Sequence, residues 1–161
     1  ANYNFIFHAT DKNKEHISSY ILKESINNVE VINDDKIKTA VLKKSIFAVV
    51  KSGTVSLEVC KMNVPSIIIY KMNLINFYLA KFLLNIKFAN MINIINNREV
   101  IPELIQSECN ADEIFKSVYY FLKKPDLIAK QKEEVKKTLE SLTSPSSSSE
   151  EASNIILSYI S

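Results

Sequence analysis

Hydrophobic residues alternate along this chain between short unbroken runs and longer stretches in which they recur at helical spacing. Short apolar runs are typical of β-strands, whereas a repeat at i, i+3 and i+4 is typical of a helix with one apolar face. The predicted strands are residues 3–8, 29–32, 46–50 and 66–70, with helices between them and two further helices at residues 111–122 and 125–142. The first seven elements follow the order β-α-β-α-β-α-β.

Polar residues mark where these helices begin. Thr10 before Asp11, and Asp34 or Asp35, are suitable N-cap residues.

Strands separated by helices pair in parallel, because parallel neighbours need a crossover connection. The pattern therefore predicts an α/β fold, a Rossmann-like parallel sheet with helices on both faces. The unbroken runs IFAVV at 46–50 and SIIIY at 66–70 predict strands that are buried on both faces.

The C-terminal part of the chain divides by composition. Residues 1–143, in a chain of 161 that is 47% hydrophobic, suit one buried domain, and residues 144–149 are a serine-rich linker. In the charged run 130–137 (KQKEEVKK) we expect a solvated helix face. Residues 150–161 predict an amphipathic helix, whose apolar stripe comprises Ala152, Ile155, Ile156, Tyr159 and Ile160. The stripe is either left undocked or pairs with a second copy to form a homodimer.

Charge and cysteine content limit the classes of partner and the cellular compartments that we expect for this chain. With 20 basic and 18 acidic residues the formal charge is +2, so no strong field favours nucleic acid as a partner. Cys60 and Cys109 are isolated, without the spacing of a metal site or a disulfide framework, which favours a reducing, cytoplasmic location. The first residues, ANYNFIFHA, lack an initiator methionine and a signal peptide, so we expect the sequence to be a fragment.

Gly53 is the only glycine in the chain and follows the third predicted strand. Ligands of parallel sheets bind beyond the carboxyl ends of the strands, and a glycine there allows positive φ and close approach of an anion to the next helix. Phosphate is the expected ligand. Glu58, one helical turn after Thr54, is placed to accept hydrogen bonds from sugar hydroxyls. The alternative is a simple helix cap at a tight corner, with Glu58 solvated.

Residues 74–88 (LINFYLAKFLLNIKF) form a stretch in which eleven of fifteen residues are apolar. A transmembrane helix needs about 20 such residues, so spanning is not expected. One alternative is a helix buried in the domain. The other is a helix partly inserted at a membrane surface, with membrane contacts from Lys71, Phe77, Lys81, Phe82 and Lys87.

A series of motifs between residues 52 and 106 resembles the lipid-A-disaccharide synthase family. The motifs are SGTVSLE at 52–58, Pro65, YKM at 70–72, LAK at 79–81, Asn93, RE at 98–99 and PELIQ at 102–106. Their spacing matches the family without a gap, and the resemblance covers most of the chain. It is weakest over the first 40 residues and the tail.

The resemblance implies the C-terminal, donor-binding half of a GT-B glycosyltransferase. The implied reaction joins the donor UDP-2,3-diacylglucosamine to the acceptor 2,3-diacylglucosamine 1-phosphate, with inversion, and releases UDP and the β-1,6-linked lipid A disaccharide. No metal and no cofactor are implied. Because both substrates are lipids of the inner leaflet, the resemblance favours a cytoplasmic protein peripheral to the inner-membrane surface.

The resemblance also implies roles for individual residues. Ser52, Gly53 and Thr54 would hold the diphosphate, and Glu58 would hold the ribose hydroxyls. Asn93 and Gln106 would line the donor pocket, with Glu103 orienting them. The alternative for Asn93 and Gln106 is hydrogen bonding within loops and helix caps.

The chain also departs from the family pattern. Ile92 stands where the family usually has proline, so we expect a less rigid loop around Asn93. The basic Gly-Ser-Arg loop and the half expected to supply the catalytic base are not in this sequence, so we expect no catalytic residue here and no turnover by this chain alone. Two alternatives are another UDP-sugar enzyme of the GT-B class and a non-catalytic UDP-binding module.

Overall fold

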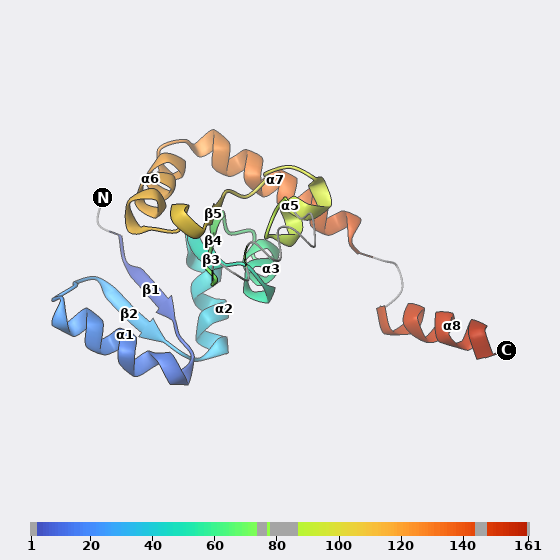
Figure 1. The fold of residues 1–161 in the computed structure, drawn as a ribbon, viewed down its shortest axis with the longest axis horizontal. Helices are drawn as coiled ribbons and strands as arrows, with labels where there is room; N and C mark the ends of the chain where they lie inside the picture. Colours follow the sequence, from blue (N-terminus) through green and yellow to red (C-terminus); the bar gives the residue numbers. More distant parts are fainter. Residues whose placement is uncertain (1–2, 74–76, 78–86, 144–147, 161) are drawn as a thin grey trace. The chain divides into compact units, whose positions relative to one another are not determined.

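The computed structural model describes residues 3–73, 77, 87–143 and 148–160. The chain divides into two compact units, Ala1–Ile46 and Phe47–Ser161. Each unit contains its own parallel sheet: β1-β2 in the first unit and β3-β4-β5 in the second. The helices and strands are drawn in Figure 1.

The first unit is one strand-helix-strand crossover followed by a helix. Its elements are β1 (Phe5–His8), α1 (Asp11–Lys23), β2 (Val29–Ile32) and α2 (Asp35–Lys44). The strands β1 and β2 pair in parallel, and α1 packs against β2. Asp34 caps α2 as predicted, because its carboxylate accepts from the Lys36 and Ile37 amides at 2.6 and 3.1 Å. Thr10 occupies the N-cap position of α1 but makes no capping hydrogen bond with its side chain.

The second unit begins with the strands that carry the Gly53 turn. Its sheet is formed by β3 (Ala48–Lys51), β4 (Ser66–Tyr70) and β5 (Glu103–Ile105), with β4 in the centre, and α3 (Thr54–Lys61) connects β3 to β4. Both strand pairs are parallel. The carboxyl ends of the three strands therefore meet at one edge of the sheet, where the Ser52–Thr54 turn also begins.

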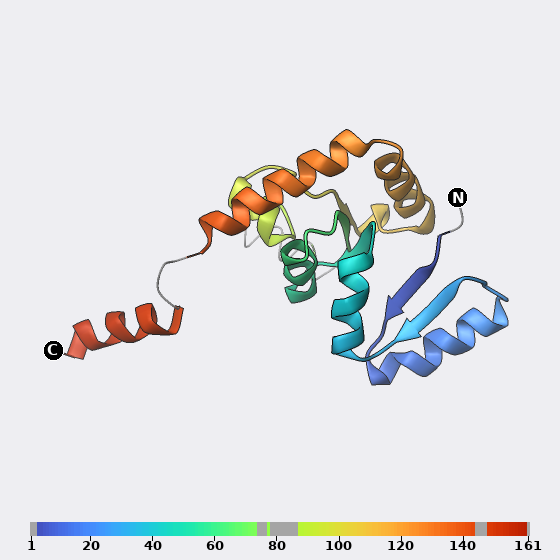
Figure 2. The ribbon, with the colours of Figure 1, turned by 180° about the vertical axis from the view of Figure 1, so that it is seen from behind.

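The second unit contains four further helices and one 3₁₀ turn among its described residues. They are α5 (Met91–Asn96), the single 3₁₀ turn η1 (Gln106–Glu108), α6 (Ala111–Leu122), α7 (Pro125–Ser141) and α8 (Ser148–Ile160). The long helix α7 packs against α3, α5 and α6 (Figure 2). It therefore packs against and stabilises α3, the helix that follows the Gly53 turn.

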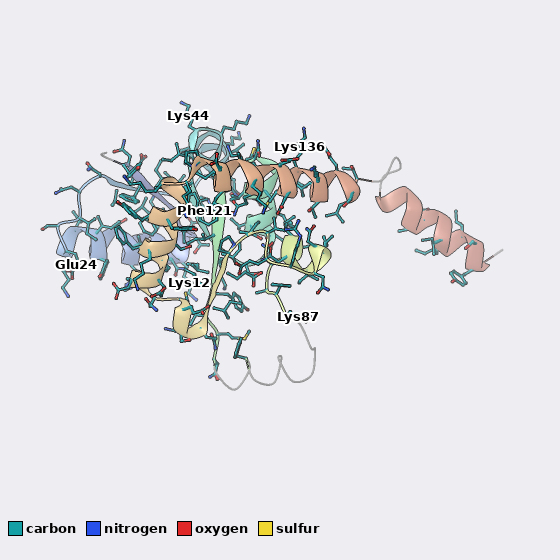
Figure 3. All side chains as sticks on the ribbon, turned by 90° about the horizontal axis from the view of Figure 1, so that it is seen from above. Lys12, Glu24, Lys44, Lys87, Phe121 and Lys136 are labelled. Atoms are coloured by element: carbon teal, nitrogen blue, oxygen red, sulfur yellow. The ribbon has the colours of Figure 1, made fainter. Side chains whose placement is uncertain are left out.

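The core of the second unit is centred on β4. Ile67 and Ile68 are 0% exposed, as are Ile92 of α5 and Ile101 before β5. Burying a side chain of this size stabilises a fold by about 1.5–3 kcal/mol relative to leaving it exposed. Phe121 of α6, labelled in Figure 3, lies with its ring centre 5.7 Å from that of Phe47, which ties α6 to the start of β3.

The structure confirms the predicted order β-α-β-α-β-α-β and the parallel pairing of the strands. It divides the strands between two sheets. The prediction that β4 is buried holds at Ile67 and Ile68, but the same prediction for β3 is wrong. Val50 is buried whereas Val49, which points to the opposite face of the strand, is 43% exposed, so one face of β3 is covered and the other is not.

The charged run 130–137 is also only partly solvated. Gln131 and Val135, four residues apart on α7, are buried, and Thr138 continues the same face. The domain limits predicted at residues 143 and 149 stay predictions.

Candidate functional site

The turn between β3 and α3 needs glycine because of its backbone conformation. Gly53 is the N-cap of α3 and has φ 138° and ψ −161°, a region that is essentially restricted to glycine. A Cβ placed on Gly53 would meet no atom of the described residues within 4 Å, its two chain neighbours aside. The requirement is therefore for positive φ, and not for the small size of glycine.

The first turn of α3 is exposed to solvent. Gly53, Thr54 and Val55 are all exposed. Gly53 has no side chain that could cap the first amides of the helix, and the positive end of the helix dipole lies at this exposed turn. Such an arrangement binds anions. Glu58 is half-buried one turn further along the same helix.

A second segment, residues 89 and 90, lies directly behind the turn. The Ser52 hydroxyl donates to the carbonyl oxygen of Ala89 at 2.6 Å. The Asn90 side-chain amide donates to Ser56 Oγ at 3.0 Å, and Ser56 Oγ donates to the Gly53 carbonyl oxygen at 2.6 Å. Ser56 and Asn90 are 2% and 0% exposed, so the bond between them is buried, while the bonds to the Gly53 and Ala89 carbonyls are partly buried.

Glu103, the first residue of β5, holds this segment in place. Its Oε2 accepts from the Ala89 amide at 2.7 Å, and its Oε1 accepts from the Asn90 amide at 2.9 Å. Oε1 also accepts from Nδ2 of Asn93 at 2.7 Å, whereas the expected role of Glu103 in orienting Asn93 and Gln106 toward a donor stays a prediction. A single carboxylate therefore organises the backbone behind the turn.

Asn93 uses its whole side-chain amide inside the protein. Its Oδ1 accepts from the Val100 and Ile101 amides at 2.8 and 2.9 Å, and its Nδ2 donates to the Ile101 carbonyl and to Glu103. An asparagine side chain has two donor hydrogens and two acceptor sites, so all four are in use. Asn93 is 0% exposed. A direct bond from Asn93 to a ligand would have to replace one of these four.

Gln106 follows β5 and pairs with the backbone after β4. Its Oε1 accepts from the Met72 amide at 2.9 Å and its Nε2 donates to the Met72 carbonyl at 3.1 Å. Within the part of the chain that the structure describes, these bonds use one of its two donor hydrogens and one of its two acceptor sites. Gln106 and Asn93 thus make hydrogen bonds within the protein, as in the alternative of loop and helix-cap hydrogen bonding. Their role in lining a donor pocket stays a prediction.

The predicted membrane contacts fall mostly outside the described residues. Lys81 and Phe82 lie outside them, as does most of the apolar stretch 74–88. Lys71 and Lys87 are exposed and Phe77 is half-buried. Among the helices that the structure describes, none is both long and apolar enough to cross a bilayer.

Cys60 is buried on α3, the helix that follows the turn. Burial raises the pKa of the Cys60 thiol to about 11, so Cys60 stays protonated at neutral pH and packs as a small apolar residue. Within the described part of the chain, no group of three or more histidine, cysteine, aspartate or glutamate side chains is placed to hold a metal ion.

Sequence reasoning missed Ser56 and Asn90. The one local signal was Asn90 immediately before the helical run MINIIN, the usual place for an N-cap, and Asn90 Oδ1 does accept from the Ile92 amide at 2.9 Å. The bond from Asn90 to Ser56 joins residues 34 positions apart and leaves no local pattern in the sequence.

The fold and the turn define a class of protein. Parallel strands flanked by helices, with a glycine turn at the carboxyl edge of the sheet, are the architecture of a Rossmann-like half of a GT-B glycosyltransferase. Residues 1–156 match the sequence profile of the family described as LpxB, lipid-A-disaccharide synthetase. The chain belongs to this family.

Individual relatives carry the name of the same family. A lipid-A-disaccharide synthase of Rickettsia bellii (strain OSU 85-389) is 41% identical over 98 residues, which cover 61% of this chain and 26% of the relative. The synthase of Persephonella marina is 34% identical over 102 residues, which cover 63% of this chain and 27% of the relative. The synthase of Rickettsia canadensis is 35% identical over 125 residues, which cover 76% of this chain and 32% of the relative. The matched region thus spans about a quarter to a third of the length of these relatives.

Proposed function

We propose that this chain binds the donor UDP-2,3-diacylglucosamine for the synthesis of lipid A disaccharide, with the diphosphate at the first turn of α3. The observation that carries the proposal is the Gly53 turn, where the exposed start of α3, without a side-chain cap at Gly53, presents the positive end of a helix dipole at the carboxyl edge of the sheet. The sugar nucleotide in this proposal is the one that the resemblance to lipid-A-disaccharide synthases implies, and membership of that family supports it. Glu58 would accept hydrogen bonds from the ribose hydroxyls.

The chemistry of this arrangement is stabilisation of a leaving group. In the proposed reaction a hydroxyl of the acceptor 2,3-diacylglucosamine 1-phosphate attacks the anomeric carbon of the donor. The bond from that carbon to the UDP oxygen breaks, and the hydroxyl proton is released. Negative charge grows on the departing diphosphate, and preorganised amides at a helix N-terminus stabilise that charge.

Contact with the inner-membrane surface is part of the same proposal. Lys71, which precedes the apolar stretch 74–88, and Lys87, near the end of that stretch, are exposed, and both would meet anionic headgroups. The homodimer proposal rests on α8, on which Ile155, Ile156 and Tyr159 are exposed at 59, 59 and 87%. Sedimentation of the chain with and without residues 148–161, and with and without anionic vesicles, tests both.

The donor proposal is tested by calorimetric titration of UDP. We expect the wild-type chain to bind UDP, and Glu58→Ala to bind it about tenfold more weakly, as for the loss of a hydrogen bond to a charged group. Glu113→Ala is the matched control, because it removes the same charge from a half-buried position on α6. Equal affinities of wild type and Glu58→Ala would remove Glu58 from the site. No binding by wild type would contradict the proposal.

A further inference from the structure

The carbonyl group of Gly53 is held from inside the protein. Its oxygen accepts from the Ser56 amide at 3.1 Å and from Ser56 Oγ at 2.6 Å. The shorter of the two bonds comes from the side chain. The orientation of the Gly53 carbonyl therefore depends on the Ser56 hydroxyl as well as on the helix.

A fixed Gly53 carbonyl also fixes the Thr54 amide. The peptide unit between them is planar and trans, so its C=O and N–H point in opposite directions. With the carbonyl turned in toward Ser56, the Thr54 N–H points out of the helix start, where Gly53 and Thr54 are exposed. The Ser56 hydroxyl thus aims the amide that would meet a diphosphate.

The Ser56 hydroxyl is itself set by Asn90. A serine hydroxyl rotates freely unless its partners fix it, and here it donates to Gly53 while it accepts from Asn90 Nδ2. Asn90 is fixed in turn by two hydrogen bonds. Its Oδ1 accepts from the Ile92 amide, and its backbone N–H donates to Glu103 Oε1. Ser56 and Asn90 are buried, at 2% and 0% exposed, and hydrogen bonds in such a low-dielectric environment are stronger than in water.

We propose that Ser56 and Asn90 are positioning residues for diphosphate binding, acting through the Gly53 carbonyl on the Thr54 amide. The inference rests on the proposed function and extends it to two buried residues that touch no ligand themselves. Their hydrogen bonds preorganise the turn, so the donor meets an amide that is already aligned.

Two substitutions break the link without removing the helices around it. Ser56→Ala deletes the hydroxyl and leaves a good helix former in α3. Asn90→Ser keeps an effective N-cap for α5 but is too short to reach Ser56. Asn110→Ser is the matched control, because Asn110 caps α6 by accepting from the Glu113 amide and lies on another helix.

The first measurement compares UDP with uridine, which lacks the phosphates. We expect Ser56→Ala and Asn90→Ser to weaken UDP binding about 3- to 10-fold, the worth of one hydrogen bond, while uridine binding and the Asn110→Ser control stay at the wild-type level. The double variant should lose no more than either single variant, because both break the same link. A merely structural defect would weaken UDP and uridine by the same factor, and that result would overturn the inference.

The second measurement needs no ligand. Because Gly53 is the only glycine, protein grown with carbonyl-labelled glycine gives one Gly carbonyl resonance by NMR. We expect this resonance to shift in Ser56→Ala and Asn90→Ser but not in Asn110→Ser. An unchanged resonance in the first two would overturn the inference alone, whereas a wild-type chain that fails to bind UDP would overturn the proposed function and the inference together.

Discussion

The side chain of Gln131 on α7 pairs with the backbone of Ser66 at the start of β4 in both directions. Gln131 Oε1 accepts from the Ser66 amide at 2.8 Å and Nε2 donates to the Ser66 carbonyl at 3.0 Å. Gln131 and Ser66 are 4% and 1% exposed. The amide therefore takes the place of a neighbouring strand for one residue and fixes α7 to the central strand of the sheet.

Replacing Gln131 with methionine is expected to lower the free energy of unfolding by about 2–4 kcal/mol. Methionine fills a similar volume but leaves the buried N–H and C=O of Ser66 without partners, and each such loss costs about 1–3 kcal/mol. Urea denaturation measures the change. Lys130→Met, at an exposed neighbouring position on the same helix, should stay within about 0.5 kcal/mol of wild type. Similar values for the two variants would contradict this account of Gln131.

The Asn93→Ala variant is expected to be destabilised by at least about 3 kcal/mol. The substitution deprives the Val100 and Ile101 amides and the Ile101 carbonyl of their side-chain partner, and it removes one donor from Glu103. Thermal unfolding followed by circular dichroism checks the loss. Asn97→Gly is the control: Asn97 is exposed, with φ 47°, and glycine adopts this backbone conformation readily. A mild effect at Asn93 would mean that water or a rearranged loop replaces these bonds.

At Gly53 we expect alanine to cost about 1–3 kcal/mol through backbone strain alone. The Cβ meets no neighbouring atom, so no steric clash adds to the strain at φ 138°. Chemical denaturation of Gly53→Ala beside Val55→Ala, an exposed position in the same first turn, isolates the backbone effect. Loss of less than about 0.5 kcal/mol would show that the turn can relax to a conformation open to other residues.

Glu99 should make stability depend on pH. Burial of its carboxyl group raises the pKa of Glu99 above the ordinary 4.5, the carboxylates of Glu103 and Glu108 raise it further, and a hydrogen bond from the Glu103 backbone opposes them. Because the folded pKa is the higher one, protonated Glu99 favours folding below about pH 4.5, and this contribution is lost as pH rises through the folded pKa.

Glu99→Gln is therefore expected to be more stable than wild type at pH 7, by less than about 1 kcal/mol because solvent screens the group. The difference should disappear near pH 4, where Glu99 is itself neutral. Glu113→Gln, a carboxylate on α6 that is paired with Lys116, should show no such gain at pH 7. Unfolding midpoints between pH 4 and 7 provide the test. A gain that persists at pH 4 would assign the effect to packing instead of charge.

Local sequence patterns were enough to predict the elements that position the turn. The period of the apolar residues placed the strand 66–70 and the helix 111–122 at the limits that the structure gives, because burial of one face imposes that period on each element separately. The single glycine likewise marked the β3–α3 turn, since positive φ is a requirement of one residue's own backbone.

By itself, then, the sequence determined the order of the elements, the parallel pairing and the family, all of which are written in neighbouring residues or in motifs of fixed spacing. Only the tertiary structure decided how polar side chains are used, whether strands share one sheet, and which face of each strand is covered. Asn93 and Gln131 bind backbone groups from elsewhere in the chain, and Asn90 meets Ser56 across 34 positions. The physical reason is that a buried hydrogen bond depends on which groups the folded chain brings within about 3 Å, and sequence distance carries no record of that.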